Sequence, residues 1–285
     1  MERNTLIGIF AGILILVLGF VINGSLALYV NIVGLLIVLG GTLGAAFISF
    51  RWERLVIVCK VLRSIYRTRT KNPEEIMETL VDLSVKSKIN GILSLQEDQE
   101  ETSIIFLKRA LGLLVDGFSM EQIREILTTE MYFFKLRREE SERVLRTIAE
   151  FCPSFGLIGS IVGLLAMLSV GYESAAVLKT VSTALTSTFY GIILANFFFL
   201  PFAAHIRERT DNELLLQKII LEAVISIEME LKPRILEMKL KSFVTPSSRY
   251  GNIISLERIR ERLKIKEEED KRMPFENQAA NNVRI

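Results

Sequence analysis

Four stretches of the chain contain no charged side chain, and they limit the fold more than any other feature of the sequence. They are Leu6–Ile22, Ile32–Phe50, Phe151–Val170 and Val181–Ala204. A helix rises 1.5 Å per residue, so about 20 apolar residues cross the hydrocarbon core of a bilayer. A chain in lipid must satisfy its backbone hydrogen bonds internally. The stretches therefore predict an all-α integral membrane fold with four transmembrane helices.

Lysine and arginine are unevenly distributed between the connections, and their distribution predicts the orientation of the spans. The connections at residues 23–31 and 171–180 contain a single basic residue, Lys179. The other flanks are rich in basic residues, which are Arg51, Arg54, Lys60, Arg63, Arg67, Arg69, Arg143, Arg146, Arg207 and Arg209. Two short loops are thus expected outside, with both termini and the middle of the chain in the cytoplasm. The expected parts are spans 1 and 2 in residues 1–50, a cytoplasmic helical domain in 51–148, spans 3 and 4 in 149–204, a cytoplasmic extension of span 4 in 205–243 and a charged, flexible tail in 244–285.

Composition argues against several classes of function. A net charge of +2 gives no reason to expect nucleic acid, which calls for a concentrated basic face. Cys59 and Cys152 flank predicted spans on the cytoplasmic side, where thiols stay reduced, so no disulfide is expected. The chain has one histidine, no glycine loop ending in Lys-Ser or Lys-Thr and no metal-ligand spacing. An enzyme is therefore least favoured, and neither a cofactor nor a metal site is expected.

Local signals place helices in the cytoplasmic segments. Asn72 followed by Pro73 is typical of a helix start, because the asparagine caps and the proline fits the first turn. Ser119 with Gln122 forms a capping box that begins a helix with no stop signal before span 3. Span 4 likewise continues beyond the membrane in a helical pattern, until Pro233 should kink or end it. A helical stalk below the membrane is predicted.

Spans 3 and 4 each carry a row of small residues at helical spacing. The rows are Gly156, Ser160, Gly163 and Met167 in span 3, and Ala184, Thr188, Gly191 and Ala195 in span 4. Small residues let helices approach closely in lipid, so the glycines and alanines favour helix packing. The hydroxyls of Ser160 and Thr188 lie near mid-span, where a polar group needs a partner. For them an ion pathway and a hydrogen bond back to their own helix are equally open.

The four stretches lack any acid, and this absence predicts a partner. Hydroxyls alone seldom desolvate and release a cation, so a conducting chain must obtain the ion-binding acid from another polypeptide. Pro153 and Pro201 lie at the cytoplasmic ends of spans 3 and 4, where each removes a backbone donor and allows a bend. A plain helix-end signal explains Pro201 equally well. His205 is interpreted as an interfacial anchor.

Three motifs, in matching spans and order, resemble the MotA, TolQ and ExbB superfamily and, within it, flagellar stator subunits. The likeness runs from about residue 5 to 240. The motifs are Ile37–Ala45 in span 2, Pro153–Leu164 in span 3, and Thr188–Gly191, Leu194–Asn196 and Leu200–Pro201 in span 4.

The resemblance implies a homo-oligomer in the bacterial inner membrane, a pentameric ring around a dimer of a MotB-like single-span partner. The partner's aspartate carries the transported H⁺ or Na⁺, and the ring acts on the rotor switch protein. Thr188 resembles the hydroxyl that faces that aspartate, and Pro153 and Pro201 resemble the prolines that couple ion passage to motion. Ser160 stands where sodium types tend to carry threonine and many proton types alanine or glycine. The coupling ion therefore stays open.

Charged side chains of the cytoplasmic domain resemble a rotor interface. Lys88 takes the place of an arginine, and Gln96 stands where the family usually has glutamate. The resemblance leaves open whether Glu97 or Asp98 supplies the missing acid. Glu130 resembles a further acidic contact. A solvated helix surface is the alternative for all five residues.

Other functions fit the pattern less well. An energising subunit of the TolQ or ExbB kind would resemble a three-span layout with an outside N-terminus, unlike the four spans predicted here. A non-conducting membrane scaffold, or a transporter with its own site, is disfavoured because the spans carry no charge.

Overall fold

The structure is a computed structural model that describes residues 29–67, 72–169 and 174–244, with scattered positions between 8 and 24. All regular structure in these residues is helical. The first expected span, Leu6–Ile22, and the expected tail beyond Val244 lie outside the continuously described part. The chain divides into two units, each considered by itself.

The first unit contains the apolar helices. Three helical stretches are long and apolar enough to cross a membrane, namely Ile32–Ser49, Met120–Ser169 and Val177–Glu228. They include three of the four expected spans, and a count of four is not established by the described residues. The helices that contribute to this unit are α2 (Ile32–Ser49), α3 (Trp52–Arg67), α7 (Met120–Ser169, from Phe134), α8 (Ser174–Ile193), the π-helical η3 (Leu194–Phe199) and α9 (Leu200–Glu228, through Asp211).

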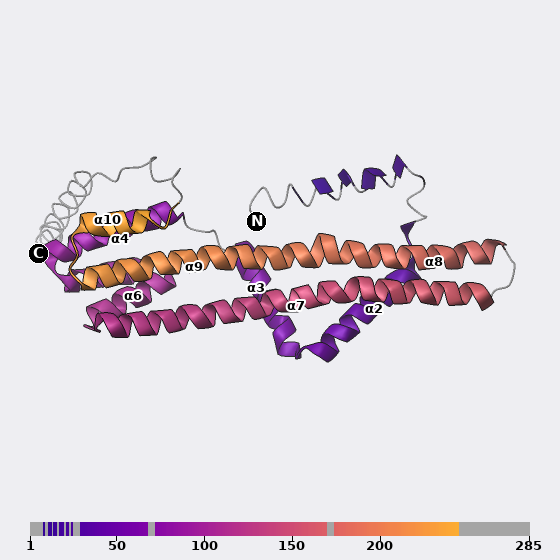
Figure 1. Cartoon of the computed structure of the whole chain (residues 1–285), viewed down its shortest axis with the longest axis horizontal. Coiled ribbons are helices and arrows are strands. Elements are labelled where there is room, and N and C mark those ends of the chain that lie inside the picture. The colour runs from indigo at the N-terminus through magenta and orange to yellow at the C-terminus, as the bar shows by residue number, and fades with distance from the viewer. Residues whose placement is uncertain are drawn as a thin grey trace, which may run out of the picture. The chain divides into compact units, whose positions relative to one another are not determined.

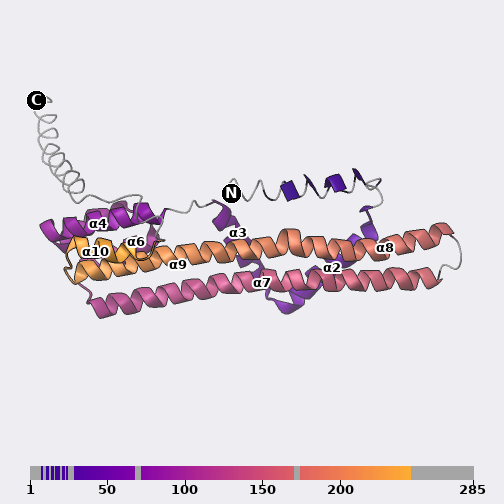
Figure 2. The same cartoon turned by 45° about the horizontal axis from the view of Figure 1, so that its top comes forward.

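Helices α7 and α8 run side by side, and α2 packs against α8 (Figure 1; Figure 2). Asn31 ties α2 to α8 at one end. Its Oδ1 caps α2 by accepting from the Gly34 N–H at 3.0 Å, while its Nδ2 donates to Thr183 Oγ1 at 2.8 Å. The Asn31 N–H donates to the Tyr190 hydroxyl at 2.7 Å, and that hydroxyl donates to the Tyr29 carbonyl. These bonds fix the register between the two helices.

Helix α3 packs its apolar face on α7 and α9. Val58 and Ile65 are buried in a cluster with residues of those helices, which are Val144, Leu145, Ile148, Ala203 and Ile206. At the end of α3, Tyr66 stacks on His205 with ring centroids 5.1 Å apart. Burial raises the pKa of the Tyr66 phenol, so it stays neutral. The imidazole predicted as an interfacial anchor thus packs on an aromatic ring.

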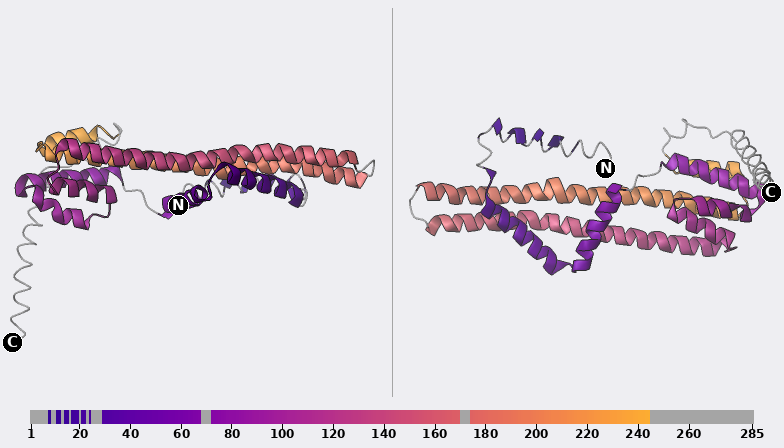
Figure 3. Two further views of the ribbon diagram at one scale, coloured as in Figure 1. Left: turned by 90° about the horizontal axis from the view of Figure 1, so that it is seen from below. Right: turned by 180° about the vertical axis from the view of Figure 1, so that it is seen from behind.

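The second unit begins with the helix that the Asn72-Pro73 pair predicted. The Asn72 side chain accepts from the Glu74 N–H at 3.4 Å, and α4 starts at Pro73. The capping box is also confirmed, since the Ser119 N–H donates to Gln122 Oε1 at 3.0 Å and α7 begins at Met120. The helices that belong wholly to this unit are α4 (Pro73–Asn90), η2 (Ile92–Leu95), α5 (Gln96–Glu101), α6 (Ile105–Val115) and α10 (Pro233–Lys241) (Figure 3).

The core of the second unit brings these helices together with the start of α7 and the end of α9. Its fully buried side chains are aliphatic and include Leu80, Leu107, Leu111, Leu127, Ile219 and Leu236. Helix α9 was expected to continue until Pro233, but it ends at Glu228. Glu230 adopts a left-handed conformation with φ 52°, which stops the helix.

Candidate functional site

The hydroxyls of Ser160 and Thr188, on neighbouring helices, form one hydrogen-bonded cluster. Their oxygens are 2.5 Å apart, joining α7 to α8. Ser160 Oγ also donates to the carbonyl of Ala184 at 2.5 Å, and the Gly156 carbonyl lies 3.3 Å from Ser160 Oγ and 3.4 Å from Thr188 Oγ1. The structure thus brings together the two residues whose role the sequence left open.

The direction of these bonds follows from counting protons. Each hydroxyl has one proton and can accept at two lone pairs. A carbonyl can only accept, so Ser160 gives its proton to Ala184 O, and Thr188 is the donor within the hydroxyl pair. Thr188 Oγ1 then has no spare proton but retains free acceptor capacity. The cluster can take a hydrogen bond from an acid or contribute an oxygen to a cation, but it carries no charge.

Glycines let α7 and α8 come close enough for this cluster to form. A Cβ at Gly156 would lie 3.1 Å from the Ser187 carbonyl oxygen, and one at Gly163 would lie 2.7 Å from the Ala184 backbone nitrogen. A Cβ at Gly191 would meet the Cys152 carbonyl oxygen at 2.5 Å. Each of the three glycines faces backbone of the neighbouring helix, and the packing role predicted for them stays a prediction.

The two prolines lie within helices and beside close contacts. Pro153 is inside α7, and its Cα would be 3.0 Å from a Cβ at Gly191. Pro201 is the second residue of α9, which begins directly after η3. Ala195, within η3, is buried against Cys152. The bend and coupling role expected of both prolines stays a prediction.

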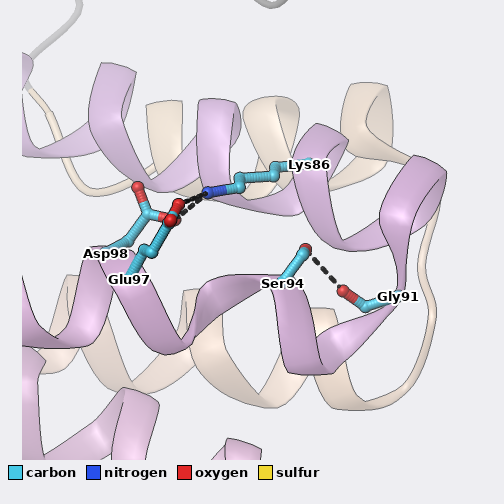
Figure 4. A network of polar contacts seen from close by, with 5 residues as sticks. All are labelled: Lys86, Gly91, Ser94, Glu97 and Asp98. Carbon is cyan, nitrogen blue, oxygen red and sulfur yellow. Dashed lines mark hydrogen bonds and ion pairs between the residues drawn. The ribbon is translucent and has the colours of Figure 1, made fainter. Parts of the chain in front are cut away.

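A second cluster joins α4 to α5 in the other unit (Figure 4). Lys86 Nζ lies 2.7 Å from Asp98 Oδ2 and 3.7 Å from Glu97 Oε2. The Lys86 side chain is 14% exposed and that of Asp98 21%, whereas that of Glu97 is 76% exposed. Gln96 is exposed at the start of α5. The lysine therefore holds Asp98 in place and leaves Glu97 reachable from solvent.

A turn at Gly91 brings this ion pair together. Gly91 ends α4 with φ 82°, a conformation that favours glycine, and its carbonyl accepts from Ser94 Oγ at 2.7 Å. The chain reverses there, so α5 returns along α4 to Lys86 (Figure 4). Sequence reasoning missed Lys86, because a lone lysine on a helix surface gives no signal of its partner.

Lys88 and Glu130 have partners within their own unit. Lys88 Nζ donates to the backbone carbonyl of Glu230 at 2.7 Å, just past the end of α9. Glu130 pairs with Arg109 of α6, with Oε2 3.2 Å from Nε. Both residues thus contribute to the fold, and their expected contact with a rotor stays a prediction.

Comparison with known proteins identifies the family. Residues 98–218 match the MotA/TolQ/ExbB proton channel family. Motility protein A of Borreliella burgdorferi is 30% identical over 242 residues, which cover 85% of this chain and 93% of that protein. The chain belongs to the MotA/TolQ/ExbB family.

Other members of the MotA/TolQ/ExbB family match over most of the chain. Chemotaxis protein PomA of Vibrio alginolyticus is 28% identical over 249 residues, covering 87% of this chain and 98% of PomA. The solved structure of C. jejuni MotAB superposes with a TM-score of 0.82 at 25% identity. That match covers 89% of this chain and 100% of the solved one. The resemblance found in the three motifs is confirmed, and it extends to the fold.

Proposed function

We propose that this chain is an ion-conducting subunit of a flagellar stator, which works with a MotB-type single-span partner to turn the rotor. The observation that carries the proposal is the Ser160–Thr188 pair, which places uncharged acceptor oxygens between two membrane helices. The likeness to motility proteins over most of the chain supports the same assignment. In this proposal both termini lie in the cytoplasm, and copies of the chain form a ring in the inner membrane.

The hydrogen-bond directions suggest how the pair senses the ion. A protonated partner aspartate donates to Thr188 Oγ1, while Thr188 continues to donate to Ser160. An ionised aspartate can only accept, so Thr188 must turn its proton toward the carboxylate and release Ser160. Loading and unloading of the partner acid therefore switch the α7–α8 contact. A charge that crosses 100 mV supplies about 2.3 kcal/mol, enough to drive such a change.

The geometry favours one candidate for the acid missing at Gln96. Asp98 is held by Lys86 and largely buried, whereas Glu97 is exposed at a longer distance from the same lysine. Glu97 can thus meet a basic side chain of the rotor without breaking a short ion pair. In this proposal Glu97 and Lys88 form the rotor surface, and Glu130 acts by supporting α6 through Arg109.

Reversing the charge of Lys88 tests this surface. We expect Lys88→Glu to lower stator recruitment to the motor several-fold and leave ion conduction intact, because the charge changes far along the sequence from Ser160 and Thr188. Lys88→Arg should retain recruitment, since arginine can also donate to the Glu230 carbonyl. Fluorescence of tagged stators at the motor and intracellular pH or sodium would be recorded together. Conduction lost with recruitment unaffected would contradict the assignment.

The requirement for a partner tests the function as a whole. We expect the chain to restore swimming to a stator-deletion strain only when it is expressed with its single-span partner. Swimming speed measured while sodium is varied at fixed pH then identifies the ion, with Ser160 implicated in selectivity if speed follows sodium. Robust cation flux through the purified chain reconstituted without a partner would overturn the proposal.

A further inference from the structure

The helix widens into a π-helical turn between α8 and α9. In η3 (Leu194–Phe199) the Leu200 N–H donates to the Ala195 carbonyl, five residues earlier instead of four. A π-helical turn inserts one residue relative to an α-helix, and such turns are rare. Pro201 follows and has no N–H to give to the Phe197 carbonyl. The α-helical ladder already lacks that bond, so widening the turn costs less here than elsewhere.

The inserted residue decides which side chains of α9 face α7. Ala195 is buried in one cluster with Cys152, and Ala203, eight residues later, is buried in the next cluster, which contains Ile148. Two turns of α-helix take about 7.2 residues, which would bring Phe202 to that position instead. Ala203 is 0% exposed, whereas Phe202 is only partly buried at the edge of the cluster. The π-helical turn keeps both alanines on α7.

Asn196 lies within the widened turn and bonds to the preceding one. Its Nδ2 donates to the Ile192 carbonyl at 2.9 Å. In an α-helix that carbonyl accepts from the backbone N–H of residue 196. The side-chain amide competes for this acceptor and so favours the longer register. The bond also satisfies a polar group that lipid would otherwise penalise.

We propose that Asn196 is a positioning residue that stabilises the π-helical register of η3. It thereby sets the rotation of α9 relative to the helix that carries Thr188. Only the consequence for torque rests on the proposed stator function. The register can be measured without it.

Disulfide cross-linking in cell membranes shows directly whether residue 203 or residue 202 faces α7. The background is the full chain with Cys59→Ser and Cys152→Ala, in which Ile148→Cys is paired with either Ala203→Cys or Phe202→Cys. We expect the 203 pair to cross-link preferentially, and Asn196→Ala to raise the 202-to-203 ratio at least about fivefold, the effect of about 1 kcal/mol. Asn196→Ser should keep the original ratio, because its hydroxyl can donate to the same carbonyl.

A deletion provides the matched control. Without the π-helical turn, residue 202 is expected to face α7, and removing Phe198 shifts the following residues by one position. The double variant Asn196→Ala with Phe198 deleted should therefore cross-link at 203 again. If Asn196→Ala does not accumulate, Asn196→Leu decides, because leucine also cannot donate to the Ile192 carbonyl. A shift of its cross-link from 203 to 202 supports the role of Asn196, and a wild-type ratio overturns it.

Two further outcomes separate the register from the function. An unchanged ratio in Asn196→Ala, or an equal shift in Asn196→Ser, would overturn the role of Asn196. We expect swimming speed to fall in Asn196→Ala and to recover in the double variant. A chain with the original Asn196 that gives the 148–203 cross-link but does not restore swimming would retain the register and count against the proposed function.

Discussion

Replacing Thr188 with valine should abolish ion-driven swimming while the protein still reaches the membrane. Valine has the same shape but neither donates nor accepts, so the 2.5 Å contact to Ser160 and the free acceptor for a partner acid are both lost. Leaving the carboxyl group of the partner acid without its hydrogen bond at this site costs about 1–3 kcal/mol, or roughly 5- to 150-fold in occupancy of the ion-loaded state. Swimming speed and ion flux, normalised to membrane content, measure the effect.

The matched control is Thr186→Val, on the same helix and equally isosteric. The Thr186 hydroxyl donates to the Ser182 carbonyl of its own helix at 2.7 Å, so its removal breaks no bond between helices. We expect this variant to swim at close to the normal speed. Equal damage from both valines would favour a packing role for Thr188 and remove the support for an ion pathway.

Gly191→Ala should destabilise the membrane unit by forcing apart α7 and α8. Its new Cβ would lie 2.5 Å from the Cys152 carbonyl oxygen and 3.0 Å from the Pro153 Cα, and backbone cannot move aside as a side chain can. Overpacking of this kind costs about 1–3 kcal/mol. The midpoint of thermal denaturation in detergent, followed by size-exclusion chromatography, would show the loss.

Gly44→Ala provides the comparison, because nothing lies within 4 Å of a Cβ at Gly44 in the described residues. The better helix propensity of alanine should leave this variant as stable as the wild type, or more stable by up to about 1 kcal/mol. A denaturation midpoint lowered equally by both substitutions would mean that α7 and α8 are not in the close contact described here.

Features set by neighbouring residues in the chain could be predicted from the sequence. Helix starts at Asn72 and Ser119 follow from caps that act within one turn, and the close approach of α7 and α8 follows from glycines at helical spacing. The pairing of Ser160 with Thr188 could be anticipated only as one of two options. Sequence spacing places a hydroxyl on a helix face but does not show which neighbour it meets.

Features set by tertiary packing could not be predicted. The end of α9 depends on the left-handed Glu230 and on Lys88, which approaches from α4 and satisfies its carbonyl. The partner of Lys86 depends on the reversal at Gly91. Asn196 and Pro201 favour the π-helical turn locally but do not predict it by themselves, because Ala195 and Ala203 require it only when both pack on α7. Each feature joins segments that the sequence cannot place side by side.

The neutrality of the Ser160–Thr188 cluster has a consequence for the cell before any motor is built. Newly made copies waiting in the membrane present oxygens that neither attract nor hold a bare ion strongly. Under the proposed function, their accumulation is expected to leave the ion gradient across the membrane intact. In the proposed stator the ion route therefore requires the acid of the partner, and a subunit without that partner is expected not to conduct.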